Sequence, residues 1–100
     1  MLRAYRQIVH GQTGIVLFEV ENLTKAPFMV KDVLMHKDDK SESPLPDQKF
    51  YLQRDTLKPS EVIRGAVTFT FSPETRKYKI SIVGHGKGGN LTLSRGGIKF

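Results

Sequence analysis

The chain has 100 residues, a length that predicts a single domain spanning residues 1 to 100 with one hydrophobic core. Hydrophobic residues make up 38% and charged residues 26%, which is ordinary for a globular protein and excludes disorder throughout. There is no cysteine, which excludes disulfides, thiolate nucleophiles and cysteine-ligated zinc, and no apolar run is long enough to insert into a membrane.

The net charge of +6 is unevenly distributed along the chain. Residues 1 to 50 carry seven basic and seven acidic side chains, whereas residues 51 to 100 carry nine basic and three acidic ones. No acidic residue follows Glu74. Asymmetry of this kind is typical of a surface for an anionic partner, and a solvated sheet edge produces it equally.

Apolar and polar residues alternate with a period of two through most of the chain, which predicts strands and no helices. Residues 2 to 9 form the first predicted strand, which we expect at the edge of a sheet. In residues 13 to 22, Val16, Phe18 and Val20 share the face that we expect to lie in the core.

Residues 28 to 36 predict a central strand on which Phe28, Val30 and Leu34 share one face. The polar segment that follows, residues 37 to 48, contains two prolines and offers little to bury. It therefore predicts an exposed, mobile loop.

Residues 49 to 55 predict a short strand, and longer strands follow at residues 61 to 71 and 76 to 84. We expect these two to form a central hairpin, with Tyr78 on the core face and the neighbouring lysines outside. A glycine-rich loop leads to a last edge strand, residues 90 to 95, with its leucines inward. About seven such strands predict an all-β antiparallel sandwich or barrel.

The segment GHGKGG, residues 84 to 89, matches the glycine spacing of a nucleotide-binding loop. A strand follows it rather than the helix that would face a pyrophosphate, so we interpret it as a hairpin loop. The three histidines, His10, His36 and His85, lie in separate segments without metal-ligand spacing. The sequence therefore predicts neither a metal nor a cofactor.

Two identical tripeptides, Asn22-Leu23-Thr24 and Asn90-Leu91-Thr92, match the glycosylation sequon, which we interpret as coincidence. No serine, histidine or paired carboxylates occupy the context of a catalytic site. We therefore expect the protein not to be an enzyme.

The basic last quarter of the chain is the strongest candidate for a binding surface. Arg76, Lys77, Lys79, Lys87 and Arg95 would contact a polyanion if the fold gathered them on one face. The aromatic residue among them falls on the core face, however, which leaves no exposed ring to stack on a base. A solvated sheet face explains the same cations, because lysines on strands oppose edge-to-edge aggregation.

Two short motifs stand in order in the middle of the chain. Val20 to Asn22 ends one strand as V-x-N and is followed by a turn and a second strand. A later segment has the form L-x-P-x-E-x-x-x-G-x-V-x-F, carried by Leu57, Pro59, Glu61, Gly65, Val67 and Phe69. Through these motifs, residues 14 to 83 resemble bacterial immunoglobulin-like accessory domains. Such domains occur on secreted lipoproteins and in envelope components of conjugation and type IV secretion systems, including the TraN family.

The resemblance implies an immunoglobulin-like β-sandwich that acts as a non-enzymatic interaction or structural module of a bacterial cell-envelope or secretion assembly. We expect a protein partner or a second copy, bound through an edge strand at residues 2 to 9 or 90 to 95, or through the 37 to 48 loop. The alternative is a small basic β domain that binds nucleic acid or another polyanion. The compartment stays open: the N-terminal segment lacks a signal peptide, whereas a mature domain would be periplasmic or extracellular.

Overall fold

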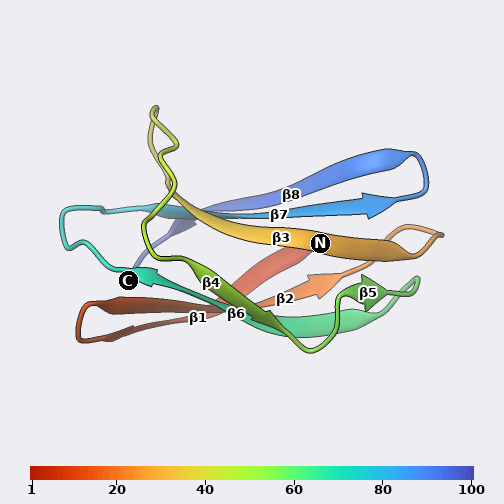
Figure 1. Cartoon of the computed structure of the whole chain (residues 1–100), viewed down its shortest axis with the longest axis horizontal. Coiled ribbons are helices and arrows are strands. Elements are labelled where there is room, and N and C mark those ends of the chain that lie inside the picture. Colours follow the sequence, from red (N-terminus) through yellow and green to blue (C-terminus); the bar gives the residue numbers. More distant parts are fainter.

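The alternating pattern of the sequence is realised as eight strands and no helix in a computed structural model that describes residues 1 to 100. The strands are β1 (Leu2–His10), β2 (Thr13–Glu21), β3 (Phe28–Lys37), β4 (Lys49–Leu52), β5 (Thr56–Leu57), β6 (Val62–Thr70), β7 (Tyr78–Gly86) and β8 (Gly89–Ile98). They form two four-stranded antiparallel sheets packed face to face (Figure 1). No helical segment with the length and hydropathy of a membrane span is present.

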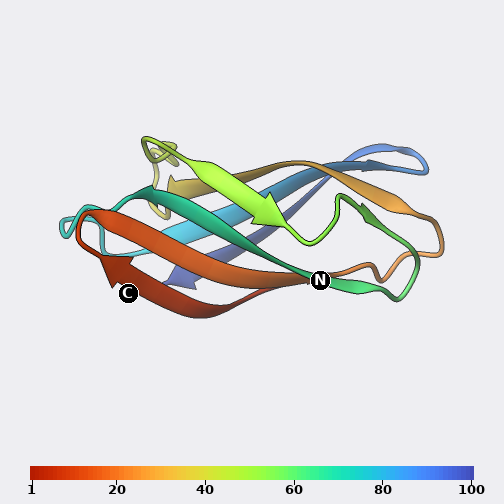
Figure 2. The same ribbon diagram turned by 60° about the horizontal axis from the view of Figure 1, so that its bottom comes forward.

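The strand order identifies the sandwich type. Sheet A has the order β1-β2-β6-β4 and sheet B the order β5-β3-β7-β8, as Figure 2 shows with sheet A turned forward. Only the β1–β2 and β7–β8 connections are hairpins within a sheet, and every other connection crosses between the sheets. This is the order of a constant-type immunoglobulin domain, with the two-residue β5 added beside β3. The predicted immunoglobulin-like sandwich is confirmed.

Both sheets turn their apolar faces inward, where 17 buried hydrophobic residues form one cluster. On β2, Val16, Phe18 and Val20 are at most 1% exposed, as their alternation predicts. Burial of each such side chain stabilises the fold by about 1.5 to 3 kcal/mol. The two sheets are therefore held together mainly by apolar burial.

Two glycines make room for phenylalanine rings in this core. Gly65 on β6 pairs with Phe18 on β2, and a Cβ atom at residue 65 would lie 2.6 Å from that ring. A Cβ atom at Gly84 would meet the Phe28 ring and lie 2.7 Å from the carbonyl oxygen of Met29. The predicted loop at residues 84 to 89 is mostly strand, because β7 continues to Gly86 and β8 begins at Gly89, and only residues 87 and 88 form the turn.

The predicted central hairpin of residues 61 to 71 and 76 to 84 is wrong, because β6 and β7 belong to different sheets. The segment between them carries the chain across the end of the sandwich. Tyr78, at the start of β7, donates its hydroxyl proton to the carbonyl oxygen of Ser72 at 3.0 Å. This is the tyrosine corner of immunoglobulin-like domains. Tyr78 is fully buried, as predicted, and its burial raises the pKa of the hydroxyl.

A β-bulge changes the predicted faces of β3. The pairing with β7 shifts register between Val30 and Asp32, so one extra residue stands in β3. Beyond the bulge, Val33 and Met35 are buried and Leu34 is only half-buried. The expectation that Leu34 shares a face with Phe28 and Val30 is wrong, because an inserted residue inverts the alternation that follows it.

The 37 to 48 loop projects from the sandwich, but it is anchored more firmly than its composition predicts (Figure 1). Leu45 is 5% exposed and its N–H donates to the carbonyl oxygen of Met35. The side-chain amide of Gln48 bonds both main-chain groups of Met35 and the carbonyl oxygen of Leu45. Residues 39 to 42 at the tip are exposed, as are Pro44, Pro46 and Asp47 on either side of the buried Leu45.

Candidate functional site

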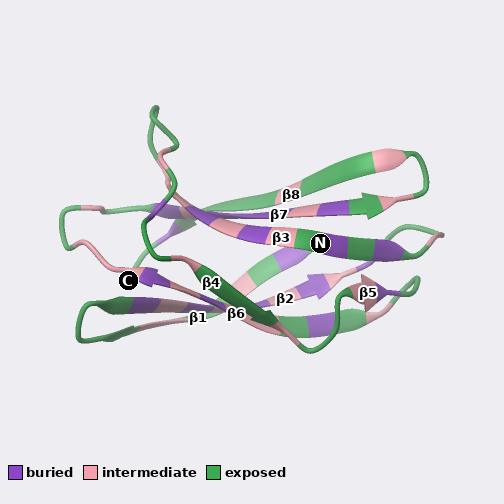
Figure 3. Ribbon diagram, viewed as in Figure 1, coloured by how far each residue is buried: buried purple, intermediate pink, exposed green.

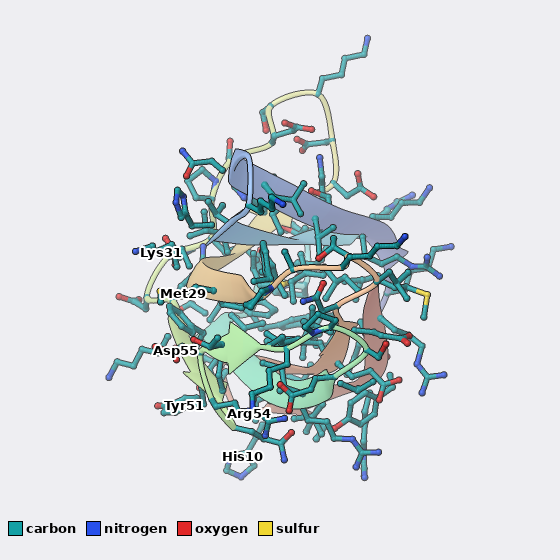
Figure 4. All side chains as sticks on the ribbon, turned by 90° about the vertical axis from the view of Figure 1, so that its right-hand side faces the viewer. His10, Met29, Lys31, Tyr51, Arg54 and Asp55 are labelled. Carbon is teal, nitrogen blue, oxygen red and sulfur yellow. The ribbon has the colours of Figure 1, made fainter.

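One flank of the sandwich is closed by the chain itself. β4 ends sheet A, β5 ends sheet B, and the short segment between them crosses in front of the space between the sheets (Figure 1). Gln53 donates its N–H to Arg64 of sheet A, and the carbonyl oxygen of Asp55 accepts from Val30 of sheet B. Figure 4, which looks onto one end of the sandwich, shows Asp55 and Tyr51 along this flank.

The opposite flank is formed by the edge strands β1 and β8, which contact each other and have no chain crossing over them. β1 is protected as an edge, because a bulge interrupts its pairing at Tyr5 and two exposed arginines, Arg3 and Arg6, stand on it. β8 is different. Most of β8 is exposed (Figure 3), and Ile98 is its only buried residue. The strand contains no proline, and Arg95 is its only charged residue.

The backbone of β8 offers hydrogen-bonding groups along this free edge. A two-residue turn joins β7 to β8 and closes on the pair Gly86 and Gly89. The pair that closes a two-residue turn is hydrogen-bonded, and non-hydrogen-bonded and hydrogen-bonded pairs alternate along the ladder from there. Asn90, Thr92 and Ser94 therefore turn their N–H and C=O groups outward, away from β7.

The free edge ends beyond Arg95, where the pairing of β8 with β7 shifts register. Asp38, at the end of β3, accepts a hydrogen bond of 2.7 Å from the N–H of Gly97. Gly97 has φ 68°, which favours glycine. This contact fixes the C-terminal end of β8 and leaves residues 89 to 95 as the regular edge.

An apolar pocket of about 310 Å³ lies beside this edge. Its apolar lining comes from both sheets, from the start of the β2–β3 loop and from the residue that precedes β1: Met1, Val20, Leu23, Phe28, Leu91 and Leu93. Leu91, which the sequence predicts to face the core, is 41% exposed because it lines this open pocket. The pocket was not predicted, since its walls come from segments far apart in the sequence.

The five cations predicted to contact a polyanion do not share one surface. Lys79 projects from β7 and its ammonium lies 2.9 Å from the Glu42 carboxylate. Arg95 pairs with Ile80, close to Lys79. Lys87 stands in the β7–β8 turn, about 26 Å further along the strand at 3.3 Å per residue.

Arg76 and Lys77 line a polar groove of about 470 Å³ at the end of the sandwich. Three carboxylates, those of Asp38, Asp39 and Glu74, line the same groove. A hydrogen bond from the Ser41 hydroxyl holds the pKa of Asp39 below its ordinary value. The fold thus places acidic side chains of the β3–β4 loop among these cations.

The Asn22 tripeptide is a structural turn. Asn22 is 4% exposed, and its side-chain amide donates to the carbonyl oxygens of Ala26 and Leu57 at 2.9 and 3.0 Å. Its amide oxygen accepts from the main-chain N–H and the hydroxyl of Thr24. Asn90 of the second tripeptide is exposed on β8, where its amide oxygen lies 3.1 Å from Nδ1 of His85.

The titratable side chains form no group of three or more histidines and carboxylates that would hold a metal ion. The arrangement best suited to binding is the regular edge of β8 with the apolar pocket beside it, because the edge offers unpaired main-chain groups and the pocket offers apolar surface. Comparisons with protein-family models, with curated proteins and with solved structures return no match.

Proposed function

We propose that this protein is a non-enzymatic interaction module that binds an extended segment of a partner protein by strand addition to β8. The observation that carries the proposal is the unprotected edge from residue 89 to 95. An added strand would satisfy the outward N–H and C=O groups of Asn90, Thr92 and Ser94.

The other edges support this choice because each is less suited to a partner. β4 has four residues and β5 has two, so either strand would offer few backbone hydrogen bonds. β1 is long, but its bulge and its arginines interrupt the edge. The resemblance of residues 14 to 83 to accessory domains of envelope assemblies supports other subunits of such an assembly as partners.

A pair of substitutions at Thr92 tests the proposal. Thr92→Pro removes one outward N–H and leaves the β7–β8 ladder intact, because proline is tolerated at edge positions whose N–H faces solvent. Thr92→Val keeps the N–H and is the matched control. Circular dichroism and thermal unfolding establish that both variants are folded.

The probe is the tightest binder selected from a displayed library of random peptides, titrated into the full chain while amide spectra are recorded by NMR. We expect the amides of Asn90, Thr92 and Ser94 to shift and to exchange more slowly on binding. We expect Thr92→Pro to weaken binding at least about tenfold and Thr92→Val to leave it unchanged. Binding that maps to the 37 to 48 loop, or that survives Thr92→Pro, would contradict strand addition at β8.

The second candidate function is binding of a polyanion, which is favoured by the absence of any acidic residue after Glu74. Counterion release makes such binding fall steeply between about 50 and 200 mM salt. Retention on heparin or DNA resin that is equal at the two concentrations would rule it out. Retention that falls steeply and is lost in Arg76→Ala and Lys77→Ala would favour it over strand addition.

A further inference from the structure

The apolar pocket beside β8 specifies what kind of strand would bind, and this inference rests on the proposed strand addition. Leu91 and Leu93 line the pocket, while the alternate residues Thr92 and Ser94 are exposed. Side chains of paired residues in an antiparallel ladder point to the same face, with Cβ atoms about 4.5 to 5.5 Å apart. The residues of an added strand that pair with Leu91 and Leu93 would therefore point toward the pocket.

The size and lining of the pocket define those side chains. An enclosed apolar cavity of about 150 Å³ holds a benzene molecule. The pocket here measures about 310 Å³, which leaves room for two aliphatic side chains. Two of its leucines are substantially exposed without a partner, Leu23 at 68% and Leu91 at 41%. Apolar side chains entering the pocket would remove this surface from water.

The charges around the edge define the ends of the strand. Lys87 stands two residues before the start of the free edge and Arg95 at its end, and β8 itself carries no acidic residue. The one carboxylate among the lining residues, that of Glu21, lies across the pocket on β2. A partner strand along residues 89 to 95 would thus pass a cation at each end.

We infer that the partner of β8 is an acidic, extended segment with two large apolar residues at positions i and i+2 and a carboxylate toward each end. A second copy of this chain fits less well. Each copy has a net charge of +6, and antiparallel pairing of two β8 strands would bring both copies of Lys87 and Arg95 to one edge.

Three capped nonapeptides test the inference. The first carries leucine at positions four and six, aspartate at both ends and threonine elsewhere; the second replaces both leucines by serine; the third replaces both aspartates by lysine. Binding to the full chain is measured by calorimetry, and the site is mapped by amide exchange. We expect the serine peptide to bind at least about tenfold more weakly than the first, and the lysine peptide about three- to tenfold more weakly.

Two protein variants link the effect to the pocket. Leu91→Ser should weaken binding of the leucine peptide at least about threefold and leave the serine peptide unaffected. Val62→Ser on β6 is the matched control, because Val62 is 48% exposed and lies outside the pocket. We expect it to change neither affinity.

The possible failures are distinguishable. If the leucine and serine peptides protect the β8 amides with equal affinity, strand addition stands and the apolar specificity is wrong. If the lysine peptide binds as well as the first, the acidic specificity is wrong. If no peptide protects the β8 amides, the proposed function itself fails. If the chain alone sediments as a dimer with β8 protected, the occupant is a second copy and the inference is overturned.

Discussion

Substituting Asn22 by aspartate tests how much one buried amide contributes to the sandwich. The two side chains have nearly the same size, but the carboxylate cannot donate the hydrogen bonds that Asn22 gives to Ala26 and Leu57. The carbonyl oxygen of Ala26 keeps a second donor, the Thr24 hydroxyl at 2.9 Å. That of Leu57 also lies in the β3–β5 ladder opposite Phe28, so each carbonyl oxygen loses one of its donors.

The expected loss follows from the oxygen that replaces the amide nitrogen, because it faces two carbonyl oxygens instead of donating to them. Leaving such a buried oxygen without a donor costs about 1 to 3 kcal/mol, and the weaker bonding of the two carbonyl oxygens costs about 0.5 to 1.5 kcal/mol more. We therefore expect Asn22→Asp to lower the free energy of unfolding by about 2 to 4 kcal/mol. In a domain of this size that is a fall in Tm of roughly 8 to 30 °C.

Urea and thermal unfolding followed by circular dichroism measure this loss. The chain supplies its own control in the identical tripeptide on β8, where Asn90 is exposed. Asn90→Asp should change the free energy of unfolding by no more than about 0.5 kcal/mol. A loss below about 1 kcal/mol for Asn22→Asp, or an equal loss for Asn90→Asp, would refute the argument from buried donors.

Three further predictions concern other contacts of the fold. Tyr78→Phe should lower the free energy of unfolding by about 1 kcal/mol through loss of the tyrosine corner. Burial raises the pKa of Tyr78, so its contribution to the free energy of unfolding should be complete below pH about 10 and should be lost as the pH rises through the raised pKa. The Tyr78→Phe variant should lack this part of the decline. Gly84→Ala should cost about 1 to 3 kcal/mol, whereas Gly86→Ala, whose Cβ has its nearest contact at 3.4 Å, should cost less. Asp38→Ala should speed amide exchange at Gly97 and cost about 1 kcal/mol.

Each of these has a measurement that decides it. Denaturation curves between neutral pH and pH 11 test the tyrosine variant, and parallel curves for the two proteins at high pH would contradict its pH dependence. Equal stability of the two glycine variants would show that the Phe28 ring moves aside. An unchanged exchange rate at Gly97 would show that the Asp38 carboxylate does not fix the end of β8.

The candidate site was only partly predictable. The sequence placed an edge strand at residues 90 to 95, and β8 is an edge. It also predicts a group of cations as a candidate binding surface, but it does not show that the Glu42 carboxylate pairs with Lys79. Those two residues are 37 positions apart, and only the crossing of β3 toward sheet A brings the loop beside β7. The pocket could not be predicted for the same reason.

The alternation of apolar and polar residues is sufficient to predict that the chain is all-β and which face of most strands is buried. Alternation is a local property, so Val16, Phe18 and Tyr78 were placed in the core correctly. Which strands pair can be read only from the tertiary structure. A period of two shows which face of a strand is buried but not which strand lies beside it. The sequence therefore predicts a hairpin of β6 and β7, although the two strands lie in opposite sheets. A single inserted residue in β3 likewise reversed the faces beyond it, because a bulge is defined by the partner strand and not by the local pattern.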